Sequence, residues 1–454
     1  MKRLNTMAVL IFGACMVLHN SAYSAVSQDE ANQLKTTLTP FGAEKSGNKD
    51  GSIPAWEGGY TKPQDGFKQG GKRADPFANE KPLFSINAKN YGQYTDKLND
   101  GQIALFKKYP DYRIDVYQTH RTAAAPQWVY DNTFKNASRA ITTHDGNSVD
   151  KAYGGIPFPI PKTGAEAIWN HRLQWTGEEL HWDFHTVITT SDDQRVLVSD
   201  SIVDNNYPYY EKNGSLESFK GEFNLLRLTT NGPPQKAGEA LLIRDPTDQI
   251  GKQRLSWQYL TGQRRVRKIP NVNYDTPSFV TSGVSNFDEV NLWYGPMDRY
   301  DWKLVGKKEL YIPYNTNKIY GPTKDADIMG THFLNPDYVR WELHRVWVVE
   351  ATLGADKRHV MPKRRFYLDE DTWNASLEDG WDAKGDIWKT LFYLNVVAPD
   401  LPGVIQGIFG HYNLQTGDWI ANNVMNEKTS QIECLPLKPD TFFTPDALAS
   451  ESVR

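Results

Sequence analysis

The sequence predicts a β-rich α+β fold, built on a large, curved antiparallel sheet with a few helices on its concave side. From about residue 180 onward, short segments alternate apolar and polar residues, which is typical of strands. Few strong helical periods interrupt this series, so a parallel sheet of βαβ units is disfavoured. Aromatic residues make up 12% of the chain, with 14 Trp and 23 Tyr, and they favour half-buried pleated surfaces.

Residues 1–24 are predicted to be an export signal. Lys2 and Arg3 precede an apolar run, Met7 to Leu18, that is too short to span a bilayer. Small residues follow, so cleavage is expected after Ser24 or Ala25. We therefore expect a mature chain that works in the periplasm as a soluble protein, where ATP and NADH are scarce.

The two cysteines leave one alternative open. Cys15 ends the segment Phe12-Gly13-Ala14-Cys15, a poor match to a lipidation signal, so a lipid-anchored envelope protein is the lesser possibility. Cys434 has no partner for an internal disulfide and no local signature of a nucleophile. The formal net charge of −4 gives no reason to expect nucleic acid as a partner.

Residues 25–150 are predicted to form an extended and helical region that packs on the main domain. A short helix is expected from Ser27 to Thr37, with Ser27 as N-cap and Glu30 completing a capping box. Residues 88–109 fit one or two helices, and residues 111–119 alternate like a strand.

The main domain is predicted to span residues 151–454. It opens with a stiff extended segment, Gly154 to Pro161, because prolines at alternate positions remove hydrogen-bond donors. Thr163 then caps a helix of about three turns, with Glu166 in its capping box. The expected strands are 181–190, 195–202, 239–244, 254–259, 264–269, 302–312, 339–352, 364–368, 387–397, 405–414 and 418–424.

The alternation within residues 339–349 predicts a strand with one face on a core and the other face largely in water. Val339, Trp341 and Leu343 share the first face, whereas Arg340 and Glu342 share the second.

Two polar groups are the candidates for metal or acid–base chemistry. His181, Asp183 and His185 would share one strand face, but residues four apart on a strand are roughly 13 Å apart, so a solvated polar face is favoured over a metal site. Asp369-Glu370-Asp371 could hold calcium or pair as acid and base, but the turn formers around it favour a polar loop.

No metal, cofactor or catalytic residue is therefore predicted. The sequence beyond the leader contains no phosphate loop, dinucleotide fingerprint, nucleophile elbow or zinc-protease motif. A basic cluster, Arg264 to Lys268, fits either an anionic partner or an edge strand protected by charge. The chain is accordingly predicted not to be an enzyme.

Several segments of the chain are distinctive when taken together: Gly51 to Gly59, Asn90 to Tyr94 with Lys97-Leu98, Val116 to Arg121, Gly154 to Pro159, Asp298 to Glu309 and Pro313 to Asn315. With these segments the chain resembles the bacterial exported family DUF1329, within the wider group of LolA/LolB-like, outer-membrane lipoprotein-sorting-like proteins. The resemblance implies a strongly bent half-barrel whose concave face, closed by helices, holds apolar ligand. It also implies an RND/MMPL-type exporter and an outer-membrane DUF1302-type protein as partners.

We therefore predict a periplasmic carrier or accessory protein that binds hydrophobic, lipid-like molecules for envelope transport. A structural or assembly subunit of an envelope complex is the first alternative, and an exported glycan or lipid hydrolase is the second. Ordinary core packing competes with ligand binding at each candidate lining residue. These candidates, chosen because they share strand faces, are Trp257, Tyr259, Trp302, Leu304, Trp341, Leu343 and Trp347.

Overall fold

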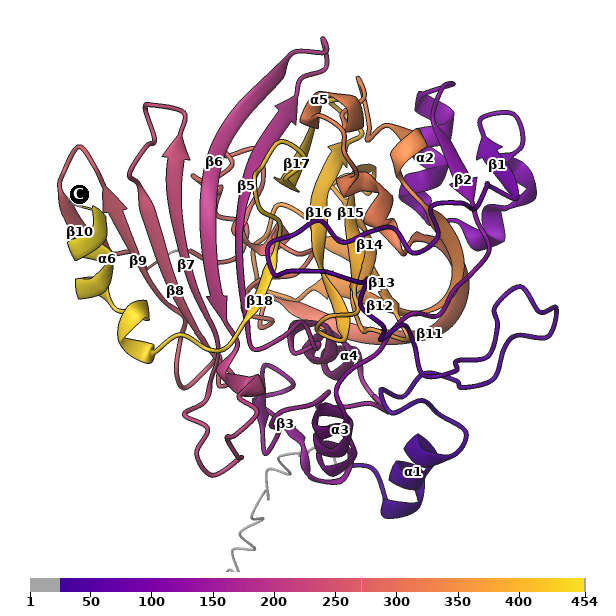
Figure 1. Cartoon of the computed structure of the whole chain (residues 1–454), viewed down its shortest axis with the longest axis horizontal. Coiled ribbons are helices and arrows are strands. Elements are labelled where there is room, and N and C mark those ends of the chain that lie inside the picture. Colours follow the sequence, from indigo (N-terminus) through magenta and orange to yellow (C-terminus); the bar gives the residue numbers. More distant parts are fainter. Residues whose placement is uncertain (1–24, 271, 453–454) are drawn as a thin grey trace, which may run out of the picture.

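A computed structural model describes residues 25–270 and 272–452, and one large sheet dominates it (Figure 1). The strands follow the order β1-β2-β12-β13-β14-β15-β16-β17-β5-β6-β7-β8-β9-β10, with β11 beside β12 and β18 beside β5. Their pairings are antiparallel except for a parallel contact between β2 and β12. The predicted β-rich fold with few helices is confirmed.

The predicted strong curvature of the sheet is not found. Among the described residues the sheet is open and not strongly curled, with β1 at one end of the strand order and β10 at the other. Both faces of the sheet are covered by buried apolar clusters. Because coverage on both sides already removes the apolar side chains from water, closing the sheet into a barrel is not needed to bury them.

The N-terminal region supplies helices and two strands of the main sheet. The predicted capping boxes are confirmed at Ser27 with Glu30 and at Thr163 with Glu166. β3 and β4 form a separate two-stranded sheet. The elements are α1 (Gln28–Asn32), β1 (Phe84–Asn87), α2 (Asp100–Lys108), β2 (Arg113–Val116), α3 (Gln127–Arg139), β3 (Ile141–Thr143), β4 (Ser148–Asp150) and α4 (Gly164–Arg172).

The remaining strands form two consecutive groups, joined in the sheet where β17 pairs with β5. The first group is β5 (Glu179–Thr189), β6 (Arg195–Asn206), β7 (Glu222–Gly232), β8 (Ala240–Pro246), β9 (Leu255–Leu260) and β10 (Arg265–Lys268). The second group is β11 (Tyr300–Pro313), β12 (Trp341–Leu353), β13 (Lys363–Asp369), β14 (Ala375–Trp381), β15 (Ile387–Ala398), β16 (Gly403–Asn413) and β17 (Trp419–Val424). α5 (Asp325–Ile328), β18 (Glu433–Leu435) and α6 (Pro445–Ser452) complete the chain.

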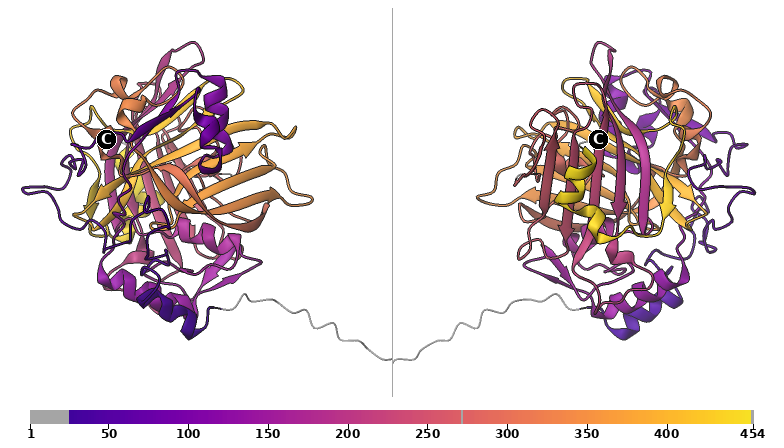
Figure 2. Two further views of the ribbon diagram at one scale, coloured as in Figure 1. Left: turned by 90° about the vertical axis from the view of Figure 1, so that its right-hand side faces the viewer. Right: turned by 60° about the vertical axis from the view of Figure 1, so that its left-hand side comes forward.

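Helices lie on both faces of the sheet, so the predicted restriction of helices to one face is not confirmed. α4 packs against β11 and β12, whereas α2 packs against β14 and β15. The Asn99 side chain at the start of α2 donates to Asp379 of β14 at 2.9 Å. Glu378 precedes Asp379 in β14, so its side chain points to the opposite face of the sheet. α6 lies across β8, β9 and β10 (Figure 2).

The predicted wet face of residues 339–349 is wrong. Nearly every residue of the first part of β12 is buried, including Glu342 at 0% exposure and His344 at 1%. The Glu342 carboxylate accepts from Arg340 Nε at 2.5 Å and lies 3.1 Å from His344 Nε2. The polar side chains of this strand face one another in a buried ion-pair network, which the alternation pattern alone cannot distinguish from a solvated face.

No described helix has both the length and the apolar content needed to cross a bilayer. The predicted export signal, residues 1–24 with Cys15, lies outside the described residues.

A long connection joins β10 to β11 and contributes residues to the candidate site. We call residues 272–299 the covering segment. Its only regular element is the short 3-10 helix η5 (Phe287–Glu289). Connections of this length without regular structure are uncommon in compact domains and usually have a function.

Candidate functional site

An apolar cavity of about 140 Å³ lies between the first strand group and the covering segment. One wall is a row of side chains on neighbouring strands: Trp182 of β5 pairs with Val203 of β6, Val203 with Leu228 of β7, and Leu228 with Leu241 of β8. Paired residues project from the same face of a sheet, so the register itself builds this wall.

The covering segment forms the opposite wall of the cavity. Val280, Phe287, Trp293 and Tyr294 come from this segment, and Phe409 of β16 contributes from the second strand group. The other apolar lining residues are Phe184, Phe223, Leu226, Ile243 and Val290.

Buried ion pairs hold the covering segment on the sheet. Asp288 Oδ2 lies 2.8 Å from both Arg364 Nη1 and His359 Nε2. Glu289 accepts from Lys389 Nζ at 2.9 Å. Burial raises the pKa of Asp288, but the charge of Arg364 and the hydrogen bond from His359 outweigh burial and lower it overall.

The cavity has a polar end where α4 finishes. Burial lowers the pKa of His171 to about 4, so this imidazole is neutral at physiological pH. Its Nδ1 accepts from the backbone N–H of Ala375 at 3.0 Å, which assigns the proton to Nε2, 2.8 Å from the carbonyl oxygen of Asn291. Both nitrogens of His171 are therefore engaged. The next residue, Arg172, lines the cavity without such partners.

The seven residues predicted to line a ligand site fall in three separate hydrophobic clusters. Trp302, Leu304 and Trp347 pack with α4, whereas Trp341 and Leu343 belong to the cluster that includes α2. Trp257 and Tyr259 pack with α6 on the face of β9 away from the cavity. None of the seven lines the apolar cavity.

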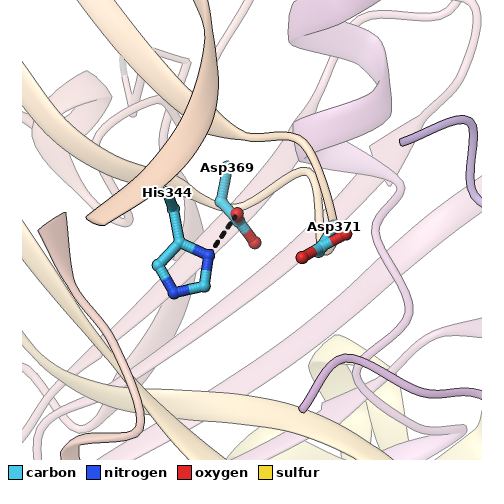
Figure 3. Close-up of side chains that lie close together, drawn as sticks. All are labelled: His344, Asp369 and Asp371. Atoms are coloured by element: carbon cyan, nitrogen blue, oxygen red, sulfur yellow. Dashed lines mark ion pairs between the residues drawn. The ribbon is translucent and has the colours of Figure 1, made fainter. Parts of the chain in front are cut away.

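A buried cluster of charged groups lies apart from the cavity, around the end of β13 (Figure 3). His344, Asp369 and Asp371 offer oxygen and nitrogen atoms within 4.8 Å of one another. Arg121, however, donates to both oxygens of Asp371, at 2.9 and 2.6 Å. Burial and then the nearby Asp371 charge raise the pKa of Asp369 to about 7. The arrangement acts as an ion-pair network. The predicted polar loop is present, since Glu370 and Asp371 lie in the turn between β13 and β14, but the three acidic residues are all buried.

The other sequence candidates are separated from one another. His181 Nδ1 lies 2.6 Å from Asp204, and His185 Nδ1 lies 2.5 Å from Asp325, so the two imidazoles face different carboxylates. Asp183 instead pairs with Lys428 at 2.9 Å. Burial raises the pKa of Cys434 to about 12, which makes this thiol a weak nucleophile.

A larger groove of about 820 Å³ lies on the surface near β3 and β4. Exposed side chains of both signs line it, among them Lys151, Lys220 and Lys252 together with Asp145. Such a lining suits water and ions better than an apolar molecule.

The sequence matches the family DUF1329, described as a protein of unknown function, over residues 85–449. The chain belongs to this family. It is 38% identical to the uncharacterized protein PA3922 of Pseudomonas aeruginosa over 452 residues, and this alignment covers 97% of each chain.

Solved structures similar to this DUF1329 protein match it at low identity. A DUF1329 family protein from Desulfovibrio piger is 15% identical, with a TM-score of 0.43, covering 63% of this chain and 97% of that chain. The LolA superfamily protein NE2245 from Nitrosomonas europaea is 11% identical, with a TM-score of 0.36, covering 63% of this chain and 100% of that chain.

Proposed function

We propose that this DUF1329 protein binds hydrophobic, lipid-like molecules and carries them through the bacterial envelope. The observation that carries the proposal is the apolar cavity between β5–β8 and the covering segment. Aromatic and aliphatic side chains form both walls, and each buried CH₂ group of a ligand would contribute about 0.8 kcal/mol.

The cavity is smaller than the roughly 300–1,000 Å³ of sites that hold drug-sized molecules. A long acyl chain would therefore need the covering segment to move away from the strands. This segment has little regular structure, whereas the strand wall is fixed by ladder hydrogen bonds. We propose that ligand entry displaces the covering segment and leaves the sheet unchanged.

A non-catalytic role fits the positions of the buried carboxylates. Asp369 and Asp371 lie in the ion-pair network and do not line the cavity. No step of the proposed function requires a nucleophile, a general base or a bound metal.

The cavity can be tested with two matched substitutions on β6. Val203 lines the cavity, whereas Val196, on the same strand, is 47% exposed. We expect Val203→Phe to fill part of the cavity and to weaken binding of the neutral dye Nile red by at least about tenfold, or about 1.4 kcal/mol. Val196→Phe should leave the affinity unchanged. Equal dye affinities for Val203→Phe and the unsubstituted chain would show that the dye binds elsewhere.

The natural cargo can be sought in protein recovered from the periplasm of the native host. We expect extracted lipids, identified by mass spectrometry, to co-purify with the unsubstituted chain and to be depleted from Val203→Phe. Absence of co-purified lipid together with absence of dye binding would favour a structural or assembly subunit.

The location and partners are proposed from the sequence resemblance. Residues 1–24 would direct export, releasing a soluble periplasmic protein that assists an RND/MMPL-type exporter and an outer-membrane DUF1302-type protein. The mass of the mature N-terminus distinguishes cleavage after Ser24 or Ala25 from lipid attachment at Cys15. Crosslinking in intact cells, with recovery of an exporter subunit, tests the partnership.

A further inference from the structure

Arg172 stands out among the side chains that line the apolar cavity. Both terminal nitrogens of its guanidinium, Nη1 and Nη2, are buried, and neither has a hydrogen-bond partner among the described residues. An arginine carries up to five N–H donors, and a buried donor without an acceptor is costly. Such a group in a cavity wall suggests that its partner is a ligand.

Two aromatic rings hold the guanidinium in place. Its central carbon lies 4.2 Å from the ring centre of Trp169 and 5.1 Å from that of Phe223. Contacts of this kind use the face of the guanidinium and leave its N–H edge available. The two rings therefore fix the orientation of the N–H edge of Arg172, but they supply no hydrogen-bond acceptor for it.

The charged groups near Arg172 do not neutralise it. The main acidic influence on the pKa of Arg172 is Asp245, but this carboxylate already accepts two hydrogen bonds from Arg254, at 2.6 and 3.1 Å. His171, the preceding residue, is neutral. Burial lowers the pKa of Arg172 to about 9, so the side chain remains a cation at neutral pH.

The wall of the cavity contains further buried polar atoms besides those of Arg172. Trp293 Nε1 is a further buried donor without a partner, and the side-chain oxygens of Asn205, Asn224 and Asn291 are buried acceptors without donors. Neutral amide oxygens can accept from water or from a hydroxyl group, but they do not balance the charge of Arg172.

We propose that the cavity binds a single-chain amphiphile with a carboxylate headgroup, the headgroup pairing with Arg172 and the chain lying against the strand wall. This inference rests on the proposed function and adds the class of ligand. A carboxylate matches the fork of a guanidinium and can accept two parallel hydrogen bonds. The apolar residues Trp182, Val203, Leu228 and Leu241 then receive the chain.

The test compares two ligands that differ only in the headgroup. Octanoate and octanol would each displace Nile red from the full mature chain at neutral pH. We expect octanoate to compete at least about tenfold more strongly than octanol, which corresponds to about 1.4 kcal/mol.

Arg172→Met should remove this preference while octanol still binds, because Met keeps an apolar stem of comparable length. Arg265→Met is the matched control, since Arg265 is exposed on the edge strand β10 and its loss should leave both affinities unchanged. Arg172→Lys should retain part of the preference.

The outcomes separate the two proposals. Equal competition by octanoate and octanol in the unsubstituted chain would overturn the carboxylate assignment and leave the apolar carrier proposal standing. Absence of competition by both ligands would count against the carrier proposal itself. If Arg172→Met does not fold, the headgroup comparison in the unsubstituted chain still decides the question.

Discussion

Substitution of Asp288 by Asn should detach the covering segment from the sheet and destabilise the whole fold. Asp288 is 1% exposed, and its carboxylate faces both Arg364 and His359 at 2.8 Å. Arg364 is fully buried and also donates to Glu378 at 2.5 Å. Burial raises the pKa of Glu378 to about 8, so at neutral pH this carboxyl is largely protonated, and Asp288 supplies the charge that balances Arg364.

The expected loss follows from this geometry. Removing one partner of a buried ion pair costs about 3–5 kcal/mol, because the other charge remains buried without compensation. The amide oxygen of Asn can still accept one hydrogen bond, so we expect a loss of about 3 kcal/mol. Native domains are stable by only about 5–15 kcal/mol, so a loss of this size is a large share of the total.

Urea denaturation followed by tryptophan fluorescence measures the free energy of unfolding, and hydrogen exchange measures local opening of residues 272–299. Asp275→Asn is the matched control within the same segment, because Asp275 pairs with Arg299 near the surface at 2.8 Å, where such a pair contributes about 0–1 kcal/mol. If the two variants unfold at the same urea concentration, the reasoning about buried charge at Asp288 is refuted.

Two further predictions concern pH and helix capping. Burial raises the pKa of Glu378 to about 8 and that of Asp379 to about 7, whereas in the unfolded chain these carboxyls lose their protons near pH ~4. Between the unfolded and folded pKa values the folded chain holds protons that the unfolded chain has lost, so these groups lower stability as pH rises from about 4 to 8, and stability should fall over the upper part of that window, from about pH 6.5 to 8. Melting temperatures across this range should show a shallower fall for Glu378→Gln, and a rise in the unsubstituted chain would contradict the assignment. Thr163→Ala removes the cap that accepts from the backbone N–H of Glu166 at 3.2 Å and should cost about 1 kcal/mol in urea denaturation. Thr441→Ala, at an exposed position in the short 3-10 helix η8 (Asp440–Phe443), should stay within about 0.5 kcal/mol, and an equal loss in both variants would argue against the capping role.

Local signals in the sequence predicted the local structure well. The two capping boxes lie where Ser27, Glu30, Thr163 and Glu166 indicated, since a cap depends on residues only three positions apart. Most of the expected strands are present within a few residues of their predicted bounds.

Burial on both faces explains two of the longer strands that the sequence patterns missed. β7 and β14 were not predicted, and both are buried along most of their length. When both faces are covered, alternation between apolar and polar residues is lost. β14 also contains Asp379 and Gly380, which are typical turn formers, yet Asp379 accepts from Asn99 and Tyr367 inside the protein. The helix α3 was missed as well.

The sequence predicted the type of the candidate site but not its position in the fold. The sequence indicated an apolar, aromatic binding surface without catalytic groups, but it did not locate that surface. Trp257 and Trp182 look alike in a strand pattern, yet the first packs under α6 and the second faces the cavity. Register shifts decide which face a side chain takes, as between Thr186 and Val187 in β5, and a bulge leaves little trace in the sequence.

Two signals in the sequence could have located the cavity. The first is the stretch between residues 270 and 299, which shows no strand or helix period and is too long for an ordinary connection. The second is Arg172, a single arginine next to His171 at the end of a short helix whose residues are nearly all buried. A cation at the end of a buried helix needs an acceptor, and the described chain provides none. Together, a long unstructured cover and a buried charge without a partner point to a ligand that is both apolar and anionic, which the aromatic content alone does not specify.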